Sequence, residues 1–401
     1  MDRSAQRVVI VGAGHAGGRA AINLRLMGHR GRIDLIGDEP HPPYERPPLS
    51  KDVLTGMVRA ESTYLRSAAA WQGSNIGLRL DTRIVEIDRE GKAVRLADGS
   101  TLPYDTLLLA TGSRARPFQG ECDPRAPVHL MRSLSDVAAL RPALHDGANV
   151  GVLGAGFIGL EVASSALQLG ARPFVIESAD RPLARLLPTA FAAWLTTLAR
   201  VHGVIFRFNT RVQRITRDAL VLESDESLRV DAVVVGIGAI PNDELAVAAG
   251  LPTDDGVLVD AQFRTVDPSI YAIGDVARRI GAPGRPAVRL ESWRNAEDDA
   301  HKVAALLCGE TTPPDSVPWF WTDVFGHNIQ LAGEPSDRFT EVVRGDPETG
   351  SFIVFYLDGN VLRGVIGVDC GRDVRVAQKL IGSGQAVDCT TLPLARAVHR
   401  P

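Results

Sequence analysis

The chain has 401 residues, of which 45% are hydrophobic and 23% are charged, and its formal net charge is −4. These values are typical of globular proteins and exclude long disordered or fibrous segments, and the length allows two or three domains. The near-neutral charge argues against nucleic-acid binding by bulk electrostatics. The four cysteines, Cys122, Cys308, Cys370 and Cys389, form no Cys-x-x-Cys pair, which argues against a disulfide framework or a metal site.

The amino-terminal segment leads directly into the apolar run 8–11. This run is too short for the core of a signal peptide, and no later run approaches the roughly 18 apolar residues of a membrane helix. We therefore expect a soluble, cytoplasmic protein that binds neither membranes nor nucleic acid.

A repeat organises the chain. The apolar strand 8–11 precedes Gly-Ala-Gly-His-Ala-Gly at 12–17, and the apolar strand 150–153 precedes Gly-Ala-Gly-Phe-Ile-Gly at 154–159. Each turn opens a helix-like stretch that ends at a glycine suited to a left-handed C-cap, Gly28 or Gly170. A second strand follows in each copy and ends in acidic residues. The repeat predicts two doubly wound α/β domains of common design.

The Gly-x-Gly-x-x-Gly pattern between a strand and a helix is typical of dinucleotide-binding turns. The first glycine permits the tight turn, the second lets a pyrophosphate approach, and the third packs the helix on the strand. The acid that follows accepts hydrogen bonds from a ribose, and Glu177 would repel a 2′-phosphate, so the second site should prefer NADH over NADPH. The alternative for each copy is a purely structural turn. The cofactor-binding candidates are Gly12, Gly14, His15, Ala16, Gly17, Asp38 and Glu39 in the first copy and Gly154, Gly156, Phe157, Ile158, Gly159, Glu177 and Gly238 in the second.

Two dinucleotide sites indicate one tightly held and one exchanging cofactor, and we expect FAD in the first and NADH in the second. The segment 265–275 supports this order, because its strand ends in Gly274-Asp275, whose carboxylate can accept a hydrogen bond from a ribityl hydroxyl. The strand 107–109 runs into Ala110, Thr111 and Gly112 in the same half of the chain.

Four further segments carry a family resemblance: Pro-Tyr-Glu-Arg-Pro-Pro-Leu-Ser-Lys at 43–51, and the segments 236–242, 291–296 and 318–323. With them, nearly the whole chain resembles the FAD-dependent NADH:ferredoxin reductases of bacterial dioxygenase and cytochrome P450 systems, and more distantly the glutathione reductase superfamily. The resemblance implies an α/β fold with two Rossmann-like dinucleotide-binding domains of the glutathione-reductase type plus a smaller α+β C-terminal interface domain. It places FAD-binding domain segments at 1–115 and 248–317, an NADH-binding domain at 116–247 and the interface domain at 318–401.

The resemblance implies hydride transfer from NADH to FAD and then single-electron transfer to a two-iron, two-sulfur ferredoxin that feeds a cytochrome P450 or a ring-hydroxylating dioxygenase. Residues 38–57 contain no cysteine, so the flavin has no local thiol to reduce, unlike in disulfide reductases. Three alternatives stay open: a rubredoxin reductase, an NADH oxidase, or a redox-sensing flavoprotein that resembles apoptosis-inducing factor. We expect a monomer or weak homodimer that contacts its partner transiently.

The resemblance also implies individual roles. Lys51, one of only four lysines, falls near the flavin N5 edge and can pair with Glu161; a purely structural ion pair is an equally good interpretation. The helix predicted over 292–308 would point its N-terminus, with Ser292 and Trp293, at the flavin, although Trp293 can also be a core aromatic. The remaining implied cofactor contacts are Arg46, Ile84 and Arg132.

Five arginines lie within 17 residues after the Gly-Asp pair, at 278, 279, 285, 289 and 294. They predict a basic rim that steers an acidic ferredoxin, although a chain with 40 arginines can produce such a cluster by composition alone. In the interface domain, 352–357 and 361–368 read as a hairpin. Trp319 and Trp321 can line the docking surface or bury one face of a strand, and Cys370 and Cys389 read as small core residues.

Overall fold

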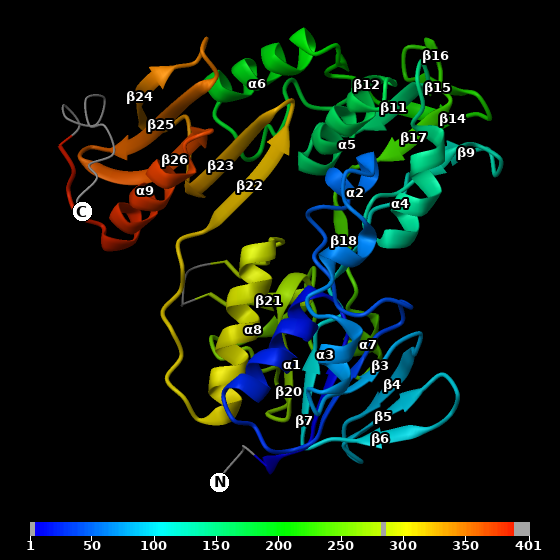
Figure 1. Cartoon of the computed structure of the whole chain (residues 1–401), viewed down its shortest axis with the longest axis vertical. Helices are drawn as coiled ribbons and strands as arrows, with labels where there is room; N and C mark the ends of the chain where they lie inside the picture. The colour runs from blue at the N-terminus through cyan, green and yellow to red at the C-terminus, as the bar shows by residue number, and fades with distance from the viewer. Residues whose placement is uncertain (1–4, 282–285, 389–401) are drawn as a thin grey trace. The chain divides into compact units, whose positions relative to one another are not determined.

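The computed structural model describes residues 5–281 and 286–388 (Figure 1). The chain divides into two compact units. Unit 1 contains Met1–Pro47, Arg59–Arg114 and Ala239–Asp315, and unit 2 contains Pro48–Val58, Ala115–Gly238 and Ser316–Pro401. Cys389 lies outside the described residues, as does Arg285. No helix in the described ranges is long and apolar enough to cross a membrane.

A five-stranded parallel sheet forms the centre of unit 1, in the order β20-β7-β1-β2-β3. Its strands are β1 (Val8–Val11), β2 (Ile33–Ile36), β3 (Gly77–Arg79), β7 (Thr106–Leu109) and β20 (Ile270–Ala272). The central strands β1, β2 and β7 are buried along their whole length, as expected for a parallel sheet that is covered on both faces.

The two faces of this sheet pack against different layers. Val8 and Ile10 point toward helices α1 (His15–Leu26) and α8 (Trp293–Cys308). Val9 and Val11 point the other way, toward the antiparallel sheet of β4 (Ile84–Asp88), β5 (Ala93–Leu96) and β6 (Thr101–Pro103). This alternation follows from the two-residue period of a strand and makes a three-layer domain.

Unit 2 repeats this plan in the order β10-β17-β11-β12-β13, again with parallel pairing. The strands are β10 (Val128–His129), β11 (Asn149–Leu153), β12 (Arg172–Ile176), β13 (Ile205–Arg207) and β17 (Ala232–Val235). Helix α5 (Phe157–Gln168) follows β11, as α1 follows β1. One face packs on the sheet of β14 (Val212–Ile215), β15 (Ala219–Leu222) and β16 (Ser227–Arg229), extended by β9 (Glu121–Cys122).

The carboxyl-terminal part of unit 2 is an antiparallel sheet in the order β22-β23-β26-β25-β24 with one helix packed on it. The elements are β22 (Trp319–Val324), β23 (His327–Gly333), β24 (Thr340–Asp346), β25 (Ser351–Asp358), β26 (Val361–Val368) and α9 (Gly371–Ser383). The hairpin predicted over 352–368 corresponds to β25 and β26 and is confirmed.

The remaining elements connect these layers, and all but the 13-residue helix α6 are short. They are α2 (Asp52–Thr55), η2 (Ala60–Thr63), α3 (Ala68–Gln72), β8 (Ser113–Ala115), α4 (Leu134–Leu140), η3 (Arg141–Ala143), α6 (Thr189–Val201), β18 (Ala239–Pro241), α7 (Glu244–Ala248), β19 (Val257–Val259), η4 (Gly274–Val276) and β21 (Ala277–Arg279). Helices α1 and α5 end before Gly28 and Gly170, both at φ +82°, so the predicted left-handed caps are confirmed. The predicted fold class, with two similar doubly wound domains and a smaller C-terminal domain, is confirmed as well.

Candidate dinucleotide sites

The first glycine-rich turn joins β1 to α1 in unit 1. Gly12 has φ +109°, and a Cβ there would lie 2.2 Å from the carbonyl oxygen of Ala110. A Cβ on Gly17 would lie 2.0 Å from the carbonyl oxygen of Gly12. At Gly14 the nearest atom is Nη2 of Arg46 at 3.8 Å. The turn is therefore closed at its first and third glycines and open at its second, where a diphosphate approaches in such turns.

The second turn joins β11 to α5 in unit 2 and has the same geometry. Gly154 has φ +95°, and a Cβ there would lie 2.5 Å from the carbonyl oxygen of Gly236. A Cβ on Gly159 would lie 2.0 Å from the oxygen of Gly154, whereas one on Gly156 would meet no atom closer than 3.9 Å. In both copies the N-cap glycine gives the helix no side-chain cap, which leaves backbone N–H groups for an anion.

The acidic residues after the second strand differ between the copies. In the first copy, Glu39 accepts hydrogen bonds from the Tyr44 hydroxyl (2.5 Å) and from Nη2 of Arg46 (2.8 Å), while Asp38 is exposed. Burial opposes ionisation of Glu39, but the charge of Arg46 and the hydrogen bond from Tyr44 lower its pKa overall. Glu39 is thus held as an ionised acceptor by Tyr44 and Arg46 of its own unit.

In the second copy, Glu177 bonds to the backbone around it. One carboxylate oxygen accepts the N–H of Ala155 in the glycine-rich turn (2.8 Å). The other accepts the N–H of Ala179 (2.8 Å) and the hydroxyl of Ser178 (3.1 Å). These bonds fix the carboxylate beside the turn, where it can accept from a ribose diol and repel a 2′-phosphate.

The side chain of His15 takes part in a buried charged cluster of unit 1. Nε2 of His15 lies 2.9 Å from Oε1 of Glu297, and Nε of Arg19 lies 2.5 Å from the same oxygen. Burial opposes ionisation of Glu297, but the hydrogen bond and charge of His15, together with Arg19, lower its pKa overall. Glu297 is therefore a carboxylate that faces two basic groups.

Helix α8, which carries Glu297, begins as predicted. Ser292 is its N-cap and accepts the N–H of Asn295 at 3.1 Å. Trp293 is the first helical residue, and its ring centroid lies 5.3 Å from that of His15. The start of α8 and the first glycine-rich turn therefore lie side by side in unit 1.

The Gly-Asp pair lies in η4 of unit 1. Asp275 accepts a hydrogen bond from the Ser113 hydroxyl at 2.8 Å. The N–H of Gly274 donates to the buried carboxyl of Asp299 (3.1 Å), which also accepts from the side-chain amide of Asn295 (3.0 Å). Burial raises the pKa of Asp299 to about 6. Asp299 positions the backbone from which Asp275 projects.

The strand-to-glycine crossing after β7 is held by reciprocal bonds to a single asparagine. The hydroxyl of Thr111 donates to the carbonyl oxygen of Asn242 (2.7 Å), and the side-chain amide of Asn242 donates to the carbonyl oxygen of Thr111 (2.9 Å). The N–H of Asn242 donates to the carbonyl oxygen of Gly112, which has φ +67°. Ala110 is buried directly before this crossing and faces Gly12.

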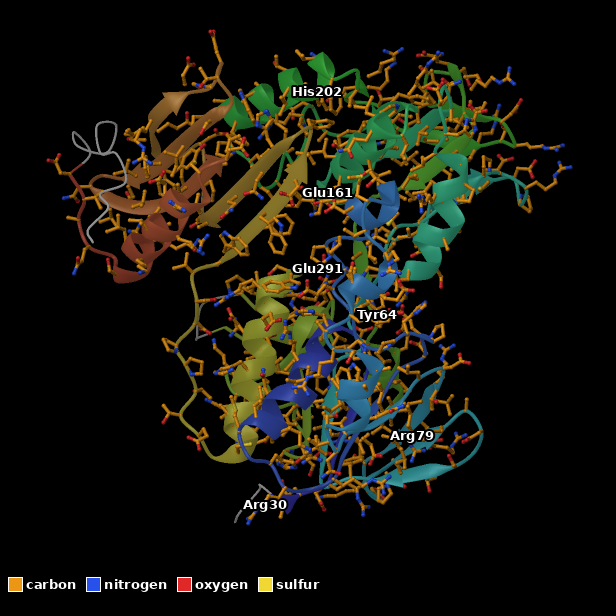
Figure 2. All side chains as sticks on the ribbon, viewed as in Figure 1. Arg30, Tyr64, Arg79, Glu161, His202 and Glu291 are labelled. Atoms are coloured by element: carbon orange, nitrogen blue, oxygen red, sulfur yellow. The ribbon has the colours of Figure 1, made fainter. Side chains whose placement is uncertain are left out.

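Lys51 and Glu161 form an ion pair within unit 2. Glu161 is labelled in Figure 2. Nζ of Lys51 lies 3.1 Å from Oε1 of Glu161 and 3.6 Å from Oδ2 of Asp323. Glu161 also accepts hydrogen bonds from the hydroxyls of Thr322 (2.7 Å) and Ser50. The carboxylate is nearly fully buried, and three donors offset the cost of its burial.

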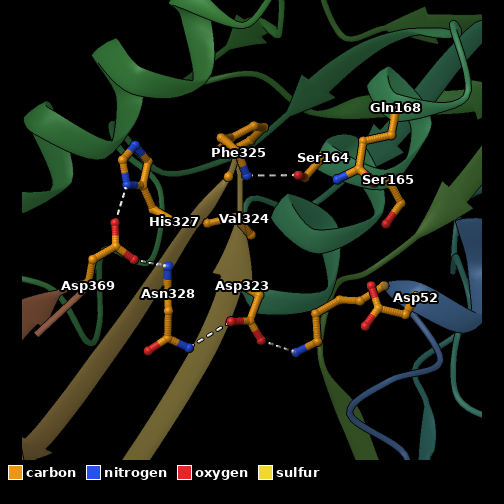
Figure 3. A pocket seen from close by; sticks show the side chains of 12 residues that line it. Asp52, Ser164, Ser165, Gln168, Asp323, Val324, Phe325, His327, Asn328 and Asp369 are labelled. Carbon is orange, nitrogen blue, oxygen red and sulfur yellow. Dashed lines mark hydrogen bonds and ion pairs between the residues drawn. The ribbon is translucent and has the colours of Figure 1, made fainter. Parts of the chain in front are cut away.

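A polar pocket of about 280 Å³ adjoins Lys51 in unit 2 (Figure 3). Asp323 accepts from the side-chain amide of Asn328 (2.7 Å), and Asp369 accepts from its backbone N–H (2.8 Å). Nδ1 of His327 lies 2.7 Å from Asp369. These bonds join β22, β23 and the segment after β26 on one side of the pocket.

The second turn also contacts the C-terminal sheet of its own unit. The ring centroids of Phe157 and Phe320 lie 3.9 Å apart. Ile158 is 39% exposed, and Gly238 has φ +109° with nothing within 4 Å of a Cβ built there. The surroundings of the second turn are thus more open than those of the first.

Two contacts implied by resemblance lie away from these turns within their own units. Ile84 is buried in β4 of unit 1. Arg132 belongs to unit 2, where its backbone N–H donates to Asp136. These placements leave the roles of Ile84 and Arg132 as predictions.

The two tryptophans of β22 contact each other in unit 2. The rings of Trp319 and Trp321 stack with their centroids 5.0 Å apart, and Nζ of Lys51 lies 5.7 Å from the centroid of the Trp321 ring.

The arginine-rich segment is less positive than its sequence indicates. Arg289 pairs with Asp255 and Glu291, and Arg278 pairs with Asp254 and Asp255. Arg279 pairs with Asp315, and Arg294 pairs with Asp298. Each of these four arginines has an acidic neighbour, which the sequence does not reveal because most of these acids lie outside the cluster.

Sequence reasoning did not find Glu297, Asp299, Thr322 or the side-chain contact of His15. A helical spacing signal was available for one of them, Glu297, since Trp293, Glu297 and Ala300 recur at intervals that place them on one face of α8. No spacing signal was available for Thr322. In the part of the chain that the structure describes, no group of three or more His, Cys, Asp or Glu side chains could hold a metal ion.

Two turns of this geometry, each after the central strand of a parallel sheet and each followed by a fixed carboxylate, define a two-dinucleotide protein. A family model described as pyridine nucleotide-disulphide oxidoreductase matches residues 6–300, and one described as reductase C-terminal matches residues 319–393. The chain therefore belongs to the pyridine nucleotide-disulphide oxidoreductase family. The family and the similar proteins confirm the two predicted cofactors, FAD and NAD.

Three similar proteins narrow the branch of this family. The ferredoxin–NAD(+) reductase component of the anthranilate 1,2-dioxygenase system of Burkholderia cepacia is 44% identical over 391 residues, which cover 96% of each chain. The rhodocoxin reductase of Rhodococcus erythropolis is 41% identical and covers 98% of this chain and 95% of its own. A crystal structure of a covalent putidaredoxin reductase–putidaredoxin complex matches with a TM-score of 0.91 at 36% identity, covering 97% of this chain and 95% of that one.

Proposed function

We propose that this protein takes hydride from NADH onto FAD and passes single electrons to a two-iron, two-sulfur ferredoxin that feeds a cytochrome P450 or a dioxygenase. The observation that carries the proposal is the pair of equivalent glycine-rich turns, of which only the first is enclosed by charged side chains of its own unit. The absence of cysteine from residues 38–57 supports an external acceptor over a thiol relay.

The first turn is the proposed FAD site. Gly12, Gly14 and Gly17 would accommodate the diphosphate, and Glu39 would accept from the ribose of the adenosine. Asp275 would accept from a ribityl hydroxyl, and the start of α8 would stabilise negative charge on the ring through its exposed N–H groups. The open space at Gly14 and the buried polar edge of His15 fit this assignment.

The second turn is the proposed NADH site. Gly154, Gly156 and Gly159 would bind the diphosphate, and Glu177 would select NADH because a 2′-phosphate would face its carboxylate. Phe157 is anchored by Phe320, so the turn is held while Ile158 stays exposed. An exposed loop suits a cofactor that binds and leaves in each cycle.

Lys51 and Glu161 are the proposed catalytic pair. FAD, when bound, accepts a hydride at N5 and releases electrons one at a time. The ammonium of Lys51 would stabilise the negative charge that arrives with the hydride, and Glu161 would hold that ammonium in place. Ser50 and Thr322 keep Glu161 oriented through their hydroxyl groups.

The proposed partner is an acidic ferredoxin that docks transiently, and the enzyme acts in the cytoplasm as a monomer or weak homodimer. The name of the Burkholderia relative includes a ferredoxin, and the similar crystal structure contains putidaredoxin. The paired arginines after the Gly-Asp motif supply little net charge for steering, so aromatic and apolar contacts carry more of the docking energy.

The test is an anaerobic titration of the purified protein with NADH and with NADPH, followed by addition of an acidic two-iron, two-sulfur ferredoxin and cytochrome c. We expect full flavin bleaching by NADH, weaker bleaching by NADPH, and rapid cytochrome c reduction only when ferredoxin is present. Rubredoxin serves as the comparison acceptor. Bleaching without transfer to the ferredoxin would contradict the proposed function and favour a redox sensor.

A further inference from the structure

Neither ring nitrogen of His15 has a hydrogen-bond partner among the described residues, although Nε2 lies close to a carboxylate. The side chain is only 8% exposed, and Nε2 faces the carboxylate of Glu297 at 2.9 Å. Nδ1 is buried and has no hydrogen-bond partner among the described residues. A buried polar atom without a partner costs about 1–3 kcal/mol, which favours a bound ligand that supplies one.

The position of His15 indicates what that ligand is. His15 is the first residue of α1 and directly follows Gly14, the glycine at which the turn is open. The first turn of α1 contains no acidic residue that would compete for its N–H groups. Anions bind at such helix starts, so the group nearest to His15 would be the diphosphate of the dinucleotide.

Charged groups from several elements surround the imidazole. Glu297 faces it from α8, and Arg19 from α1 shares that carboxylate and also reaches Glu45 at 3.7 Å. Arg46, which pairs with Glu39 and senses the charge of Asp275, lies 3.8 Å from a Cβ position on Gly14. Glu297 therefore fixes one edge of the ring and leaves Nδ1 for a ligand on the other edge.

We propose that His15 is a specific FAD-binding side chain whose ring is held on its Nε2 edge by Glu297 and donates through Nδ1 to the diphosphate of FAD. This inference rests on the proposed assignment of FAD to the first turn. It adds to the backbone contacts of the glycine motif a side-chain donor whose position is set by Glu297, the positioning residue.

A second buried histidine of unit 1 provides a matched control. His29 follows the other end of α1 and bonds through Nε2 to the backbone carbonyl of Gln6 at 2.9 Å, away from the glycine-rich turn. The substitutions His15→Gln and His29→Gln therefore remove a buried imidazole from the same helix region, but only the first removes a donor near the proposed diphosphate site.

The experiment measures FAD binding to apoprotein by flavin fluorescence and the ³¹P NMR signal of the diphosphate in the holoenzyme, both at the same pH. In His15→Gln we expect the FAD dissociation constant to rise about tenfold or more and the ³¹P signal to move from its wild-type position, because the diphosphate has lost the imidazole donor. His29→Gln keeps the wild-type dissociation constant and ³¹P signal.

Glu297→Gln keeps the imidazole and covers the case in which His15→Gln does not fold. We expect weaker FAD binding and a changed ³¹P signal, because the ring has lost the carboxylate that positions it. The proposal is overturned if either variant matches the wild type in both affinity and ³¹P signal. The assay contains neither NADH nor ferredoxin and so measures FAD binding alone. Failure of the wild-type protein to bind FAD would overturn the proposed function instead.

Discussion

The two glycine-rich turns have almost the same backbone but different surroundings. In each, the first glycine approaches a carbonyl oxygen of a neighbouring strand end, and the third approaches the first. Around the first turn, Arg46 pairs with Glu39, and His15 lies 2.9 Å from Glu297. Around the second, the acid bonds only to nearby backbone and a serine, and Ile158 is exposed.

This difference shows that the backbone motif specifies the class of ligand and the neighbouring side chains specify how long it stays. A turn enclosed by paired charges holds its cofactor through several side chains at once, and dissociation must break all of them. An exposed turn with a single fixed carboxylate recognises its cofactor and releases it. The first site therefore suits retention of FAD, and the second suits exchange of NADH and NAD.

The largest expected effect comes from an alanine at the first glycine of either turn. Gly12→Ala and Gly154→Ala each put a Cβ within 2.5 Å of a carbonyl oxygen at a positive φ. We expect Gly12→Ala to purify without flavin, and Gly154→Ala to purify with flavin but to be reduced by NADH about a hundredfold more slowly, since strain of about 2–3 kcal/mol opposes its loop geometry. Absorbance spectra and stopped-flow reduction measure both. Loss of flavin from Gly154→Ala would contradict the assignment of FAD to the first turn and NADH to the second.

The next effect tests whether the Lys51–Glu161 pair is catalytic or structural. Lys51→Met removes the ammonium and keeps the length of the side chain, so we expect flavin reduction by NADH to slow by about tenfold to a hundredfold. The melting temperature should fall as well, because the buried carboxylate of Glu161 loses its cationic partner. Lys379→Met, at an exposed lysine of the same unit, is the control. An unchanged reduction rate with a lower melting temperature would show a structural ion pair instead.

The acid of the second copy, Glu177, should affect the binding of the nicotinamide cofactor and not that of the flavin. Glu177→Gln removes the charge that faces the ribose, so we expect the KM for NADH to rise about tenfold and the preference over NADPH to fall, with full flavin content. Glu226→Gln, at an exposed glutamate of unit 2, should change neither. Steady-state kinetics with both nucleotides measures the effect, and an unaltered NADH/NADPH ratio would remove Glu177 from the selectivity argument.

The buried carboxyl of Asp299 makes the stability of unit 1 depend on pH. Glu161 has a direct cationic partner, whereas Asp299 accepts only neutral donors, and its pKa is raised from 3.8 to about 6. Because the folded state binds this proton more tightly than the unfolded state, the free energy of unfolding should fall by roughly 2–3 kcal/mol as the pH rises from about 4 to about 6, and stay level above that. Denaturant unfolding of Asp299→Asn should lack this decrease. The same slope in Asp299→Asn and the wild type would contradict the assignment.

The smallest effect concerns the arginine-rich segment of unit 1. Because its described arginines are paired, we expect the rate of electron transfer to ferredoxin to fall only about two- to threefold between 50 and 300 mM salt, whereas unpaired charges would give a steep dependence. Stopped-flow measurements over this range of salt decide between the two. A steep decrease would restore the steering interpretation of the sequence.

Much of the fold follows from local sequence. The spacing of the glycines, the left-handed caps at Gly28 and Gly170, the N-cap at Ser292 and the hairpin after 351 are short-range features, which the sequence reveals because each depends on a few adjacent residues.

The site is less predictable because its decisive contacts join distant segments. His15 meets Glu297, Glu161 meets Thr322, and Arg289 meets Asp255 only after the sheets have formed. Their residue types alone also fit solvated surface positions. The arginine cluster shows the consequence: a net positive segment in sequence becomes a set of ion pairs in space.

The central claim, that one turn retains its dinucleotide and the other exchanges it, can be tested in one step. The purified protein is mixed with excess NAD, passed over a desalting column, and its bound dinucleotides are released by heat and quantified by mass spectrometry. We predict one equivalent of FAD and almost no NAD in the wild type. Retention of NAD at a stoichiometry similar to that of FAD, or loss of both, would contradict the account.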